Sequence, residues 1–473
     1  MAGAPKSDWD KIRGMFLSFD YDEWLEQLGG HGGFGVSRLL FLSILYIGMW
    51  SILNIQIPNL LLLTFSWIVG TSPIWMPIAL IVGAYHVWVW YARSNFIYKQ
   101  KFTLLEMKIP REIFKSPRAM ETVLTNLWIP SRETHIIMRI IQGTMRPWYS
   151  LEIASLGGEI HFYIWVPELW RKGIEATIYA EYPEIELHEA EDYAQKYTYD
   201  PKTQTVYICD WRLEPFTHDE AGCPNRDAYP MKSYLDFELE QDPKEEYKVD
   251  PLTTVLELLS SMKREQQLWV QIGITPAWRT GVLIRKDHMW KHIVEQEVEK
   301  VRLESVTLPE GSALAHISGE RLRSARPRAT WKQTQQIETM ERHLGKHPFE
   351  VVIRGVYISP TKDYGWRFWD MRWMWRPWAN QQYMSQLRNR RWHEMFDWPW
   401  MDWHDFRWDQ QTLRGLDAYR RRSFFYPPWE TPTNVMTTEL IASIWHPVSS
   451  TAKAPGLNRM PATKSAPPQN LPM

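Results

Sequence analysis

One apolar stretch, residues 36–92, limits the folds open to this chain more than any other feature. After Arg38 it contains no Asp, Glu, Lys or Arg up to its end. A helix needs about 20 apolar residues to cross the roughly 30 Å hydrocarbon core of a bilayer. Residues 39–57 and 73–92 each meet that length, and the apolar residues between them either lengthen the first helix or lie at the membrane surface. The sequence therefore predicts a transmembrane hairpin, in preference to a hairpin buried in a soluble core.

Basic residues flank both ends of the predicted hairpin. Cytoplasmic segments next to a membrane are enriched in Lys and Arg, so these charges predict the topology. Both termini are expected in the cytoplasm, in a multi-pass protein of the cytoplasmic membrane. The flanking residues are Lys11, Arg13 and Arg38 before the spans, and Arg93, Lys99, Lys101, Lys108 and Arg111 after them.

Residues 1–35 carry charges where a cleaved signal peptide has its apolar core, so we expect the anchor to stay in the mature protein. Their apolar positions predict an amphipathic segment, either a helix on the inner membrane surface or one packed on the soluble part.

Short strands alternate with helices from residue 102 onward. Their order is βαββαβ, the split unit of the ferredoxin-like fold, which we predict over residues 102–200. The predicted strands are 102–109, 148–153, 159–166 and 184–190, and the predicted helices are 117–128 and 168–182.

A second ferredoxin-like unit is predicted over residues 230–360, with a charged insertion at 286–330. The fold class is therefore α+β: a transmembrane hairpin, tandem ferredoxin-like units and a helical segment rich in Trp and Arg. The elements predicted for the second unit are the strands 234–239, 267–274 and 349–358 and the helices 251–263, 286–304 and 330–344.

Tryptophan and arginine concentrate in residues 363–430, which we predict to be an interaction segment. Both residue types are enriched at protein interfaces, and aromatic rings with Arg also suit single-stranded nucleic acid. Acidic residues among the Arg residues weaken the nucleic-acid alternative. A membrane-interface belt and internal packing are further interpretations. The candidate partner interface comprises Trp366, Trp369, Arg372, Trp373, Trp375, Trp378, Arg390, Arg391, Trp392, Trp398, Trp400, Trp403 and Trp408.

The remaining features favour no particular chemistry. The net charge is −1, from 54 basic and 55 acidic residues, so no global field marks the chain for nucleic acid or anionic lipid, and any such role must come from a local patch. Cys209 and Cys223, the only cysteines, are too few for a disulfide scaffold or a four-cysteine zinc site. The Pro-rich tail, residues 447–473, is expected to be extended and poorly packed.

We assign no catalytic, cofactor-binding or metal-binding residues. His288 and His292 are four residues apart but lack the Glu of a zinc-binding helix motif and a third ligand. The acidic run at 181–192 is expected to be a solvated sheet edge rather than a cation site, because alternate residues of a strand face opposite sides.

Several sequence segments between residue 102 and the C-terminus, taken in order, resemble the region between membrane anchor and motor domain in coupling-protein-like and type IV secretion ATPases of candidate-phyla bacteria. They are KIPREIFKSP (108–117), WYSLEIASLGGEIHFYIWVP (148–167), IYAEYP (178–183), EDY (191–193), RSFFYPP (422–428), ELIASIWHP (439–447) and PPQNLP (467–472).

In those relatives the Pro-rich phrase leads into a P-loop motor, whereas this sequence ends at Met473. The resemblance implies a non-catalytic, oligomeric scaffold that docks a separate P-loop ATPase and other secretion subunits. Two alternatives remain open: a membrane-anchored factor that binds single-stranded DNA, and a self-assembling membrane structural protein. An enzyme with a site built from scattered residues is a further, weaker alternative.

Overall fold

The computed structural model describes a long helix and most of the chain that follows it. Residues 1–35, predicted as an amphipathic segment, and the predicted span 39–57 apart from Gly48 lie outside the described part. Contacts divide the chain into one unit of Met1–Trp88 and Glu394–Trp408 and another of Val89–His393 and Asp409–Met473. The described residues are 48, 60–110, 115–129, 137–215, 226–237, 250–277, 290–306, 329–360, 367–380, 385–392, 406–426, 428–449, 454–457 and 459.

Helix α4 (Leu60–Lys99) differs from the predicted hairpin. It is one helix of 40 residues, so residues 60–72, expected between two spans, continue directly into the predicted second span, 73–92. Among the described residues this is the one helix long and apolar enough to cross a membrane, with Thr64–Lys99 as the candidate span. The described part of the chain therefore does not support a multi-pass topology.

The helix passes through Pro73, where we began the second span. Proline has no N–H to donate to the carbonyl four residues earlier, which is that of Val69. The hydroxyl of Ser72 donates to this carbonyl instead, at 2.7 Å. Hydroxyl side chains compensate for prolines in this way in apolar helices, so the helix continues without a break.

Among the described residues of the second unit, nine strands form one sheet, in the order β4-β1-β3-β2-β6-β7-β5-β8, with β9 paired to β7 outside this path. Every pairing in it is antiparallel. The strands are β1 (Phe102–Lys108), β2 (Tyr149–Leu156), β3 (Glu159–Pro167), β4 (Glu186–Glu189), β5 (Gln204–Pro215), β6 (Gln267–Pro276), β7 (Pro348–Pro360), β8 (Ser385–Arg391) and β9 (Asn434–Thr437).

The sheet contains the same strand order twice. β1, α5 (Pro117–Leu127), β2, β3, α6 (Arg171–Glu181) and β4 follow one another along the chain, and their strands lie in the order β4-β1-β3-β2. β5, α8 (Leu252–Ser260), β6, β7, α12 (Arg367–Trp373) and β8 repeat this arrangement, in the order β8-β5-β7-β6. Pairing of β2 with β6 joins the two halves. The predicted α+β class is confirmed.

The second half begins earlier than predicted. Its first strand was predicted at 234–239, but the described residues of that segment, 234–237, form a turn, and β5 takes that place. Residues 238–239 lie outside the described part. The strand prediction for this segment was wrong because Tyr234 is buried by tertiary packing and not by strand pairing. Its N–H donates to the Ser443 hydroxyl at 2.8 Å. The last strand, β8, comes from the Trp- and Arg-rich residues 363–430, which therefore contribute to the sheet.

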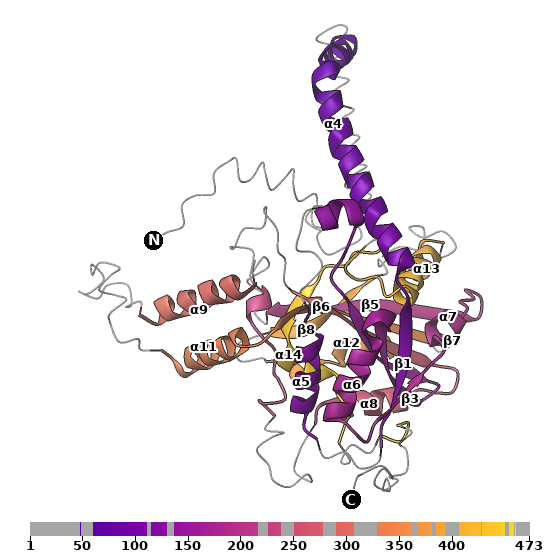
Figure 1. Ribbon diagram of the computed structural model, residues 1–473, viewed down its shortest axis with the longest axis vertical. Helices are drawn as coiled ribbons and strands as arrows, with labels where there is room; N and C mark the ends of the chain where they lie inside the picture. The colour runs from indigo at the N-terminus through magenta and orange to yellow at the C-terminus, as the bar shows by residue number, and fades with distance from the viewer. Residues whose placement is uncertain are drawn as a thin grey trace, which may run out of the picture. The chain divides into compact units, whose positions relative to one another are not determined.

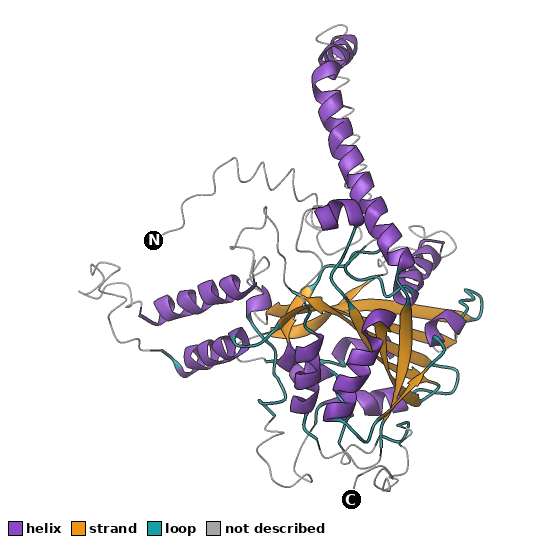
Figure 2. Cartoon of the chain, in the orientation of Figure 1, coloured by secondary structure: helices purple, strands orange, loops and turns teal. Residues whose placement is uncertain are grey.

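Helices cover both faces of the sheet (Figures 1 and 2). α5, α6, α8, α12 and α14 (Thr438–Ile444) pack on one face. α7 (Tyr193–Lys196), the later part of α13 (Phe406–Arg420) and residues 423–426 pack on the other. Between β6 and β7 the chain inserts α9 (Trp290–Val306) and α11 (Trp331–Leu344), which pack together around a small cluster of their own. The short helices are η1 (Met138–Gln142), η2 (Glu168–Trp170), η3 (Arg226–Ala228) and η7 (Arg376–Trp378).

The first part of the predicted tail packs on the body rather than extending from it. Val448, Ala454 and Leu457 are buried. The N–H of Ile160 donates to the carbonyl of Gly456 at 2.8 Å, and a Cβ at Gly456 would lie 1.9 Å from the carbonyl oxygen of Gly158. Glycine is therefore required for this close approach. Residues 460–473 lie outside the described part.

Candidate functional site

A row of polar residues crosses the sheet on the face that α7 and α13 cover. The register pairs each residue directly with the next, from one edge strand to the other. Paired positions lie within about 5.5 Å of each other, so the side chains form one band. In spatial order they are His188, Glu106, Tyr163, Glu152, Gln271, Arg354, Asp210 and Arg390.

Glu152 lies near the middle of this row and is fully buried. Its carboxylate accepts hydrogen bonds from the hydroxyls of Ser150 and Tyr193, each at 2.8 Å, and from the amide of Gln271 at 3.1 Å. A buried carboxylate without compensation costs several kcal/mol. These donors account for part of that compensation, and a buried cation supplies the rest.

The cation is Arg422, which follows the end of α13. Its Nε donates to Oε1 of Glu152 at 3.0 Å and its Nη2 to Oε2 at 3.2 Å. The same guanidinium pairs with Asp192 through Nη1 and, at 3.1 Å, through Nη2. The ring of Trp165 lies 5.6 Å from it, centroid to Cζ. One guanidinium therefore connects β2 to the segment before α7.

The backbone of Arg422 is left-handed, with φ 47°, unlike that of every other described residue except glycines. It ends α13 in a Schellman motif: the N–H of Ser423 donates to the carbonyl of Ala418 at 3.0 Å, and that of Arg422 to Tyr419 at 3.1 Å. Glycine is usual there because a side chain costs about 1 kcal/mol in this conformation. The ion pair with Glu152 offsets that cost.

Burial and charge shift the pKa values around Arg422. Burial alone lowers the pKa of its guanidinium, but the charges of Glu152 and Asp192 outweigh this and raise it. Burial, followed by the charge of Glu152, raises the pKa of Tyr193 and of Tyr419. Both phenols therefore stay protonated and can donate hydrogen bonds. Together with the ion pairs of Arg422, these bonds form a network at the centre of the row that holds α7 and α13 on the sheet.

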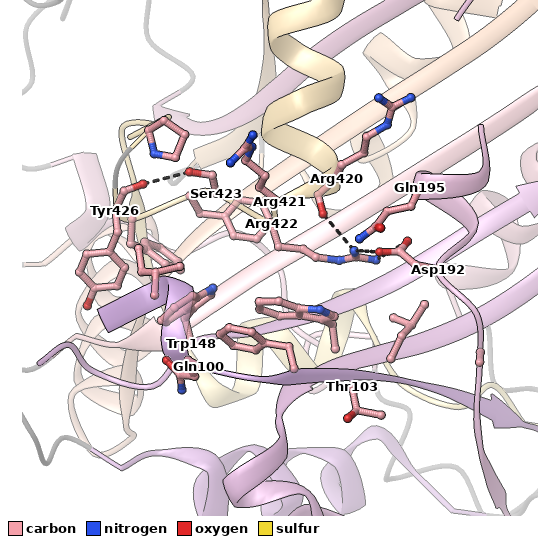
Figure 3. Close-up of a pocket in the computed structure, with 18 of the residues that line it drawn as sticks. Gln100, Thr103, Trp148, Asp192, Gln195, Arg420, Arg421, Arg422, Ser423 and Tyr426 are labelled. Atoms are coloured by element: carbon pink, nitrogen blue, oxygen red, sulfur yellow. Dashed lines mark hydrogen bonds and ion pairs between the residues drawn. The ribbon is translucent and has the colours of Figure 1, made fainter. Parts of the chain in front are cut away.

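A cavity of about 430 Å³ lies beside this network (Figure 3). Arg422 and Asp192 meet at one side of it, and Trp148 and Tyr426 lie at the other. The ring of Phe102 stacks on Trp165 with centroids 3.8 Å apart. The cavity is lined by Ile97, Gln100, Phe102, Thr103, Leu104, Trp148, Trp165, Glu189, Ala190, Asp192, Gln195, Arg420, Arg421, Arg422, Ser423, Phe424, Phe425, Tyr426 and Pro428.

Part of the predicted Trp and Arg interface is exposed on α12 and η7. Trp369 and Trp373 are 41% and 47% exposed. The guanidinium of Arg372 lies 5.3 Å from the Trp369 ring and 5.4 Å from the Trp373 ring, and that of Arg376 lies 5.0 Å from Trp373. Stacking holds both guanidinium groups in place. We call Trp369, Arg372, Trp373 and Arg376 the Trp–Arg ladder.

Other members of the predicted interface serve the fold. Trp375 and Trp378 are buried in the main core, where internal packing accounts for them. The indole N–H of Trp392 donates to Asp210 at 2.8 Å, and Arg390 pairs with Glu214 at 2.7 Å.

The remaining predicted positions are placed as follows. Arg391 is exposed on β8, and Trp408 lies on α13. Trp366, Trp398, Trp400 and Trp403 lie outside the described residues.

The sequence patterns did not predict the polar row or the role of Arg422. Asp192 ends the acidic run at 181–192, for which we expected a solvated edge, yet it pairs with buried Arg422. A usable signal was present: Glu152, Gln271 and Arg354 are polar residues in the interior of largely apolar strands. Within the described ranges, His, Cys, Asp and Glu form no group of three that could hold a metal.

Comparison with known proteins finds no protein-family model that matches this chain and no match among the curated proteins.

Proposed function

We propose that the chain is a non-catalytic scaffold subunit of the cytoplasmic membrane that docks a separate P-loop ATPase of a type IV secretion, conjugation or pilus-like machine. The apolar surface of α4 carries the proposal. Ile74, Ile78 and Ile81 are 72%, 61% and 69% exposed, and the most apolar window of the candidate span is not buried. Apolar surface in water costs about 25 cal/mol per Å², so a bilayer is the fitting environment for this helix.

The end of α4 belongs to the folded body. Ala92 is buried, and Phe96 and Ile97 pack against a core cluster of the second unit. These residues belong to the last turns of the candidate span, Thr64–Lys99, within the continuous helix α4. The proposed anchor therefore continues directly into the body.

The finer features of the proposal are a second span over residues 39–57, with both termini cytoplasmic, and two ferredoxin-like units in tandem. The repeated strand order favours the tandem units. The resemblance to the pre-motor region of secretion ATPases favours homo-oligomeric assembly and a motor supplied by another polypeptide.

The Trp–Arg ladder is the proposed docking surface on the body. Exposed aromatic and Arg side chains dominate the binding energy of many interfaces, and stacked guanidinium groups lose little further freedom on binding.

Membrane extraction tests the anchor. We expect the full-length chain to stay in the pellet after a carbonate wash. The double variant Leu80→Arg/Ile81→Arg should lower the pelleted fraction. Each Arg near a helix centre raises the free energy of membrane insertion by about 2.5–3.5 kcal/mol. Leu169→Arg/Leu303→Arg adds the same charge at exposed positions of the body and should change nothing. Release of the wild-type chain by carbonate contradicts membrane anchoring.

Affinity purification from native membranes in mild detergent, followed by mass spectrometry, tests the docking role. A P-loop ATPase that co-purifies at moderate salt, and is lost with Trp369→Ala/Trp373→Ala but kept with Tyr179→Ala, supports the proposal. Tyr179 is matched in exposure, at 41%. Recovery of nucleic acid that salt removes favours the DNA-binding alternative. Recovery of the chain alone favours a self-assembling structural protein.

A further inference from the structure

We propose that the cavity beside the end of α4 binds the phosphate headgroup of an anionic phospholipid. This inference rests on the membrane location in the proposed function and adds a specific ligand to it. Three observations carry it: the place of the cavity in the chain, the charges around it and the nature of its walls.

The end of the apolar helix and the residues that follow it form one part of the cavity wall. Ile97 and Gln100 line it, and Lys99, between them, is the last residue of α4. The last turns of the helix carry exposed Trp90, Tyr91 and Tyr98. Trp and Tyr are enriched where a membrane helix meets the headgroup region. A bilayer that contains this helix therefore brings phosphate groups to the level of the cavity.

The carboxylates of the lining are already neutralised from within the protein. Glu189 pairs with Arg171 at 2.8 Å, and Asp192 pairs with Arg422. These anions leave little negative charge to repel a phosphate.

Of the basic residues that line the cavity, Arg421 pairs with Asp417 and Arg422 with Asp192, but Arg420 has no carboxylate partner among the described residues. Arg420 donates to the backbone carbonyls of Ala194 and Tyr197, and Arg93 lies over the Tyr426 ring, 6.0 Å from its centroid. With Lys99 and Lys101, they form no ion pair with a carboxylate anywhere in the described part of the chain. The uncompensated charge at the cavity is therefore positive, which favours an anion.

The walls suit the rest of a lipid headgroup. Phe102, Trp148, Trp165 and Phe425 provide apolar surface, and Thr103 and Gln100 provide polar groups. A volume of about 430 Å³ is within the range of sites that enclose small organic groups. An aromatic-lined cavity with Arg side chains in its wall fits a phosphate ester with a glycerol unit. A soluble nucleotide shares this chemistry and is distinguished in the test.

The full-length chain, reconstituted into nanodiscs of phosphatidylcholine with or without phosphatidylglycerol, provides the test. Native mass spectrometry after transfer to neutral detergent counts retained lipids, and titration with short-chain phosphatidylglycerol gives an affinity. We expect preferential retention of phosphatidylglycerol by the wild type. Arg93→Gln/Arg420→Gln should weaken binding about thirtyfold, which corresponds to about 1 kcal/mol for each basic group.

Three further variants make the result specific. Arg93→Lys/Arg420→Lys should restore most of the affinity. Lys99→Gln/Lys101→Gln, at exposed positions that leave folding intact, should weaken binding several-fold. Arg264→Gln/Lys332→Gln removes the same charge from exposed positions outside the lining and should leave affinity unchanged.

Equal retention of both lipids by the wild type, or equal loss in the Arg264→Gln/Lys332→Gln control, overturns the inference. Displacement of the short-chain lipid by inorganic phosphate or adenosine monophosphate at similar concentration overturns the lipid assignment in favour of a soluble phosphate ester. Co-elution of the protein with nanodiscs tests the membrane anchor alone. The titration in neutral detergent tests lipid binding at the cavity alone. A failure of membrane anchoring is therefore distinguishable from a failure of lipid binding.

Discussion

The guanidinium of Arg422 and the carboxylate of Glu152 form two hydrogen bonds, of 3.0 Å and 3.2 Å, between residues 270 positions apart in the chain. Glu152 lies on β2, opposite Gln271 in the β2–β6 pairing that joins the two halves of the sheet. Arg422 closes the end of α13. The pair therefore fastens the layer of α7 and α13 to the centre of the sheet.

Loss of Arg422 should destabilise the fold strongly. Arg422→Leu leaves Glu152 buried without its cation, which should lower the free energy of unfolding by about 3–5 kcal/mol. Arg421→Leu, at the exposed neighbour, should change it by less than about 0.5 kcal/mol. Denaturant unfolding of both variants measures the difference. The double variant Glu152→Leu/Arg422→Leu should recover part of the loss, and no recovery would contradict direct coupling of the pair.

Stability should fall at acid pH because of His343. Burial, and then the charge of Arg342, lowers its pKa to about 3, although Asp236 and Glu121 oppose the shift. An unfolded His has a pKa of about 6.5, so the unfolded chain binds the extra proton between these values. The contribution of neutral His343 to the free energy of unfolding is fully present above about pH 6.5. This contribution is lost as pH falls toward about 3, by at most about 1.4 kcal/mol per pH unit.

Thermal unfolding of the wild type and His343→Gln between pH 7 and pH 5 tests this contribution. The variant should depend less on pH in that window. The same dependence in both proteins would assign the acid sensitivity to other groups.

Tryptophan substitutions should separate packing from docking. Trp375→Ala and Trp378→Ala remove buried rings and should each cost about 3–5 kcal/mol. Trp369→Ala and Trp373→Ala, at exposed positions of the Trp–Arg ladder, should each change stability by about 0.5 kcal/mol or less. Unfolding midpoints check all four. A large loss at the exposed pair would mean that the ladder stabilises the fold.

Two glycines should respond oppositely to alanine. A Cβ at Gly273 would lie 2.4 Å from the Phe424 ring, so Gly273→Ala should cost about 1–3 kcal/mol. A Cβ at Gly173, inside α6, meets nothing within 4 Å. Gly173→Ala should therefore stabilise the protein by about 0.5–1 kcal/mol, since alanine favours the helix. Unfolding midpoints that shift in the same direction would contradict the packing against Phe424.

Local pattern predicted the first half of the sheet well. Residues 102–109, 117–128 and 159–166 correspond to β1, α5 and β3 within a few residues. Each has one clear periodicity because one side faces a core. β5 escaped prediction because apolar residues occupy both of its sides, with Val206 in one core cluster and Tyr207 in the other. A strand buried on both faces loses the alternation that identifies a half-buried one.

The candidate sites were less predictable than the elements. The Trp–Arg ladder could be nominated from composition, but composition did not separate exposed Trp373 from buried Trp375. The cavity and the polar row draw on residues from 97 to 428, so no local pattern reports them.

The sequence alone determined the apolar α4 segment, the α+β class and the order of most strands and helices, because periodicity records which side of an element is buried. Only the tertiary structure decided what covers each side. The tertiary structure paired β2 with β6 and brought Arg422 to Glu152. It also continued the helix through Pro73, where the Ser72 hydroxyl donates to the carbonyl of Val69. Strand register and ion pairing depend on contacts between residues that are distant in the sequence. Such contacts produce no periodic pattern in the sequence, so they cannot be predicted from it locally.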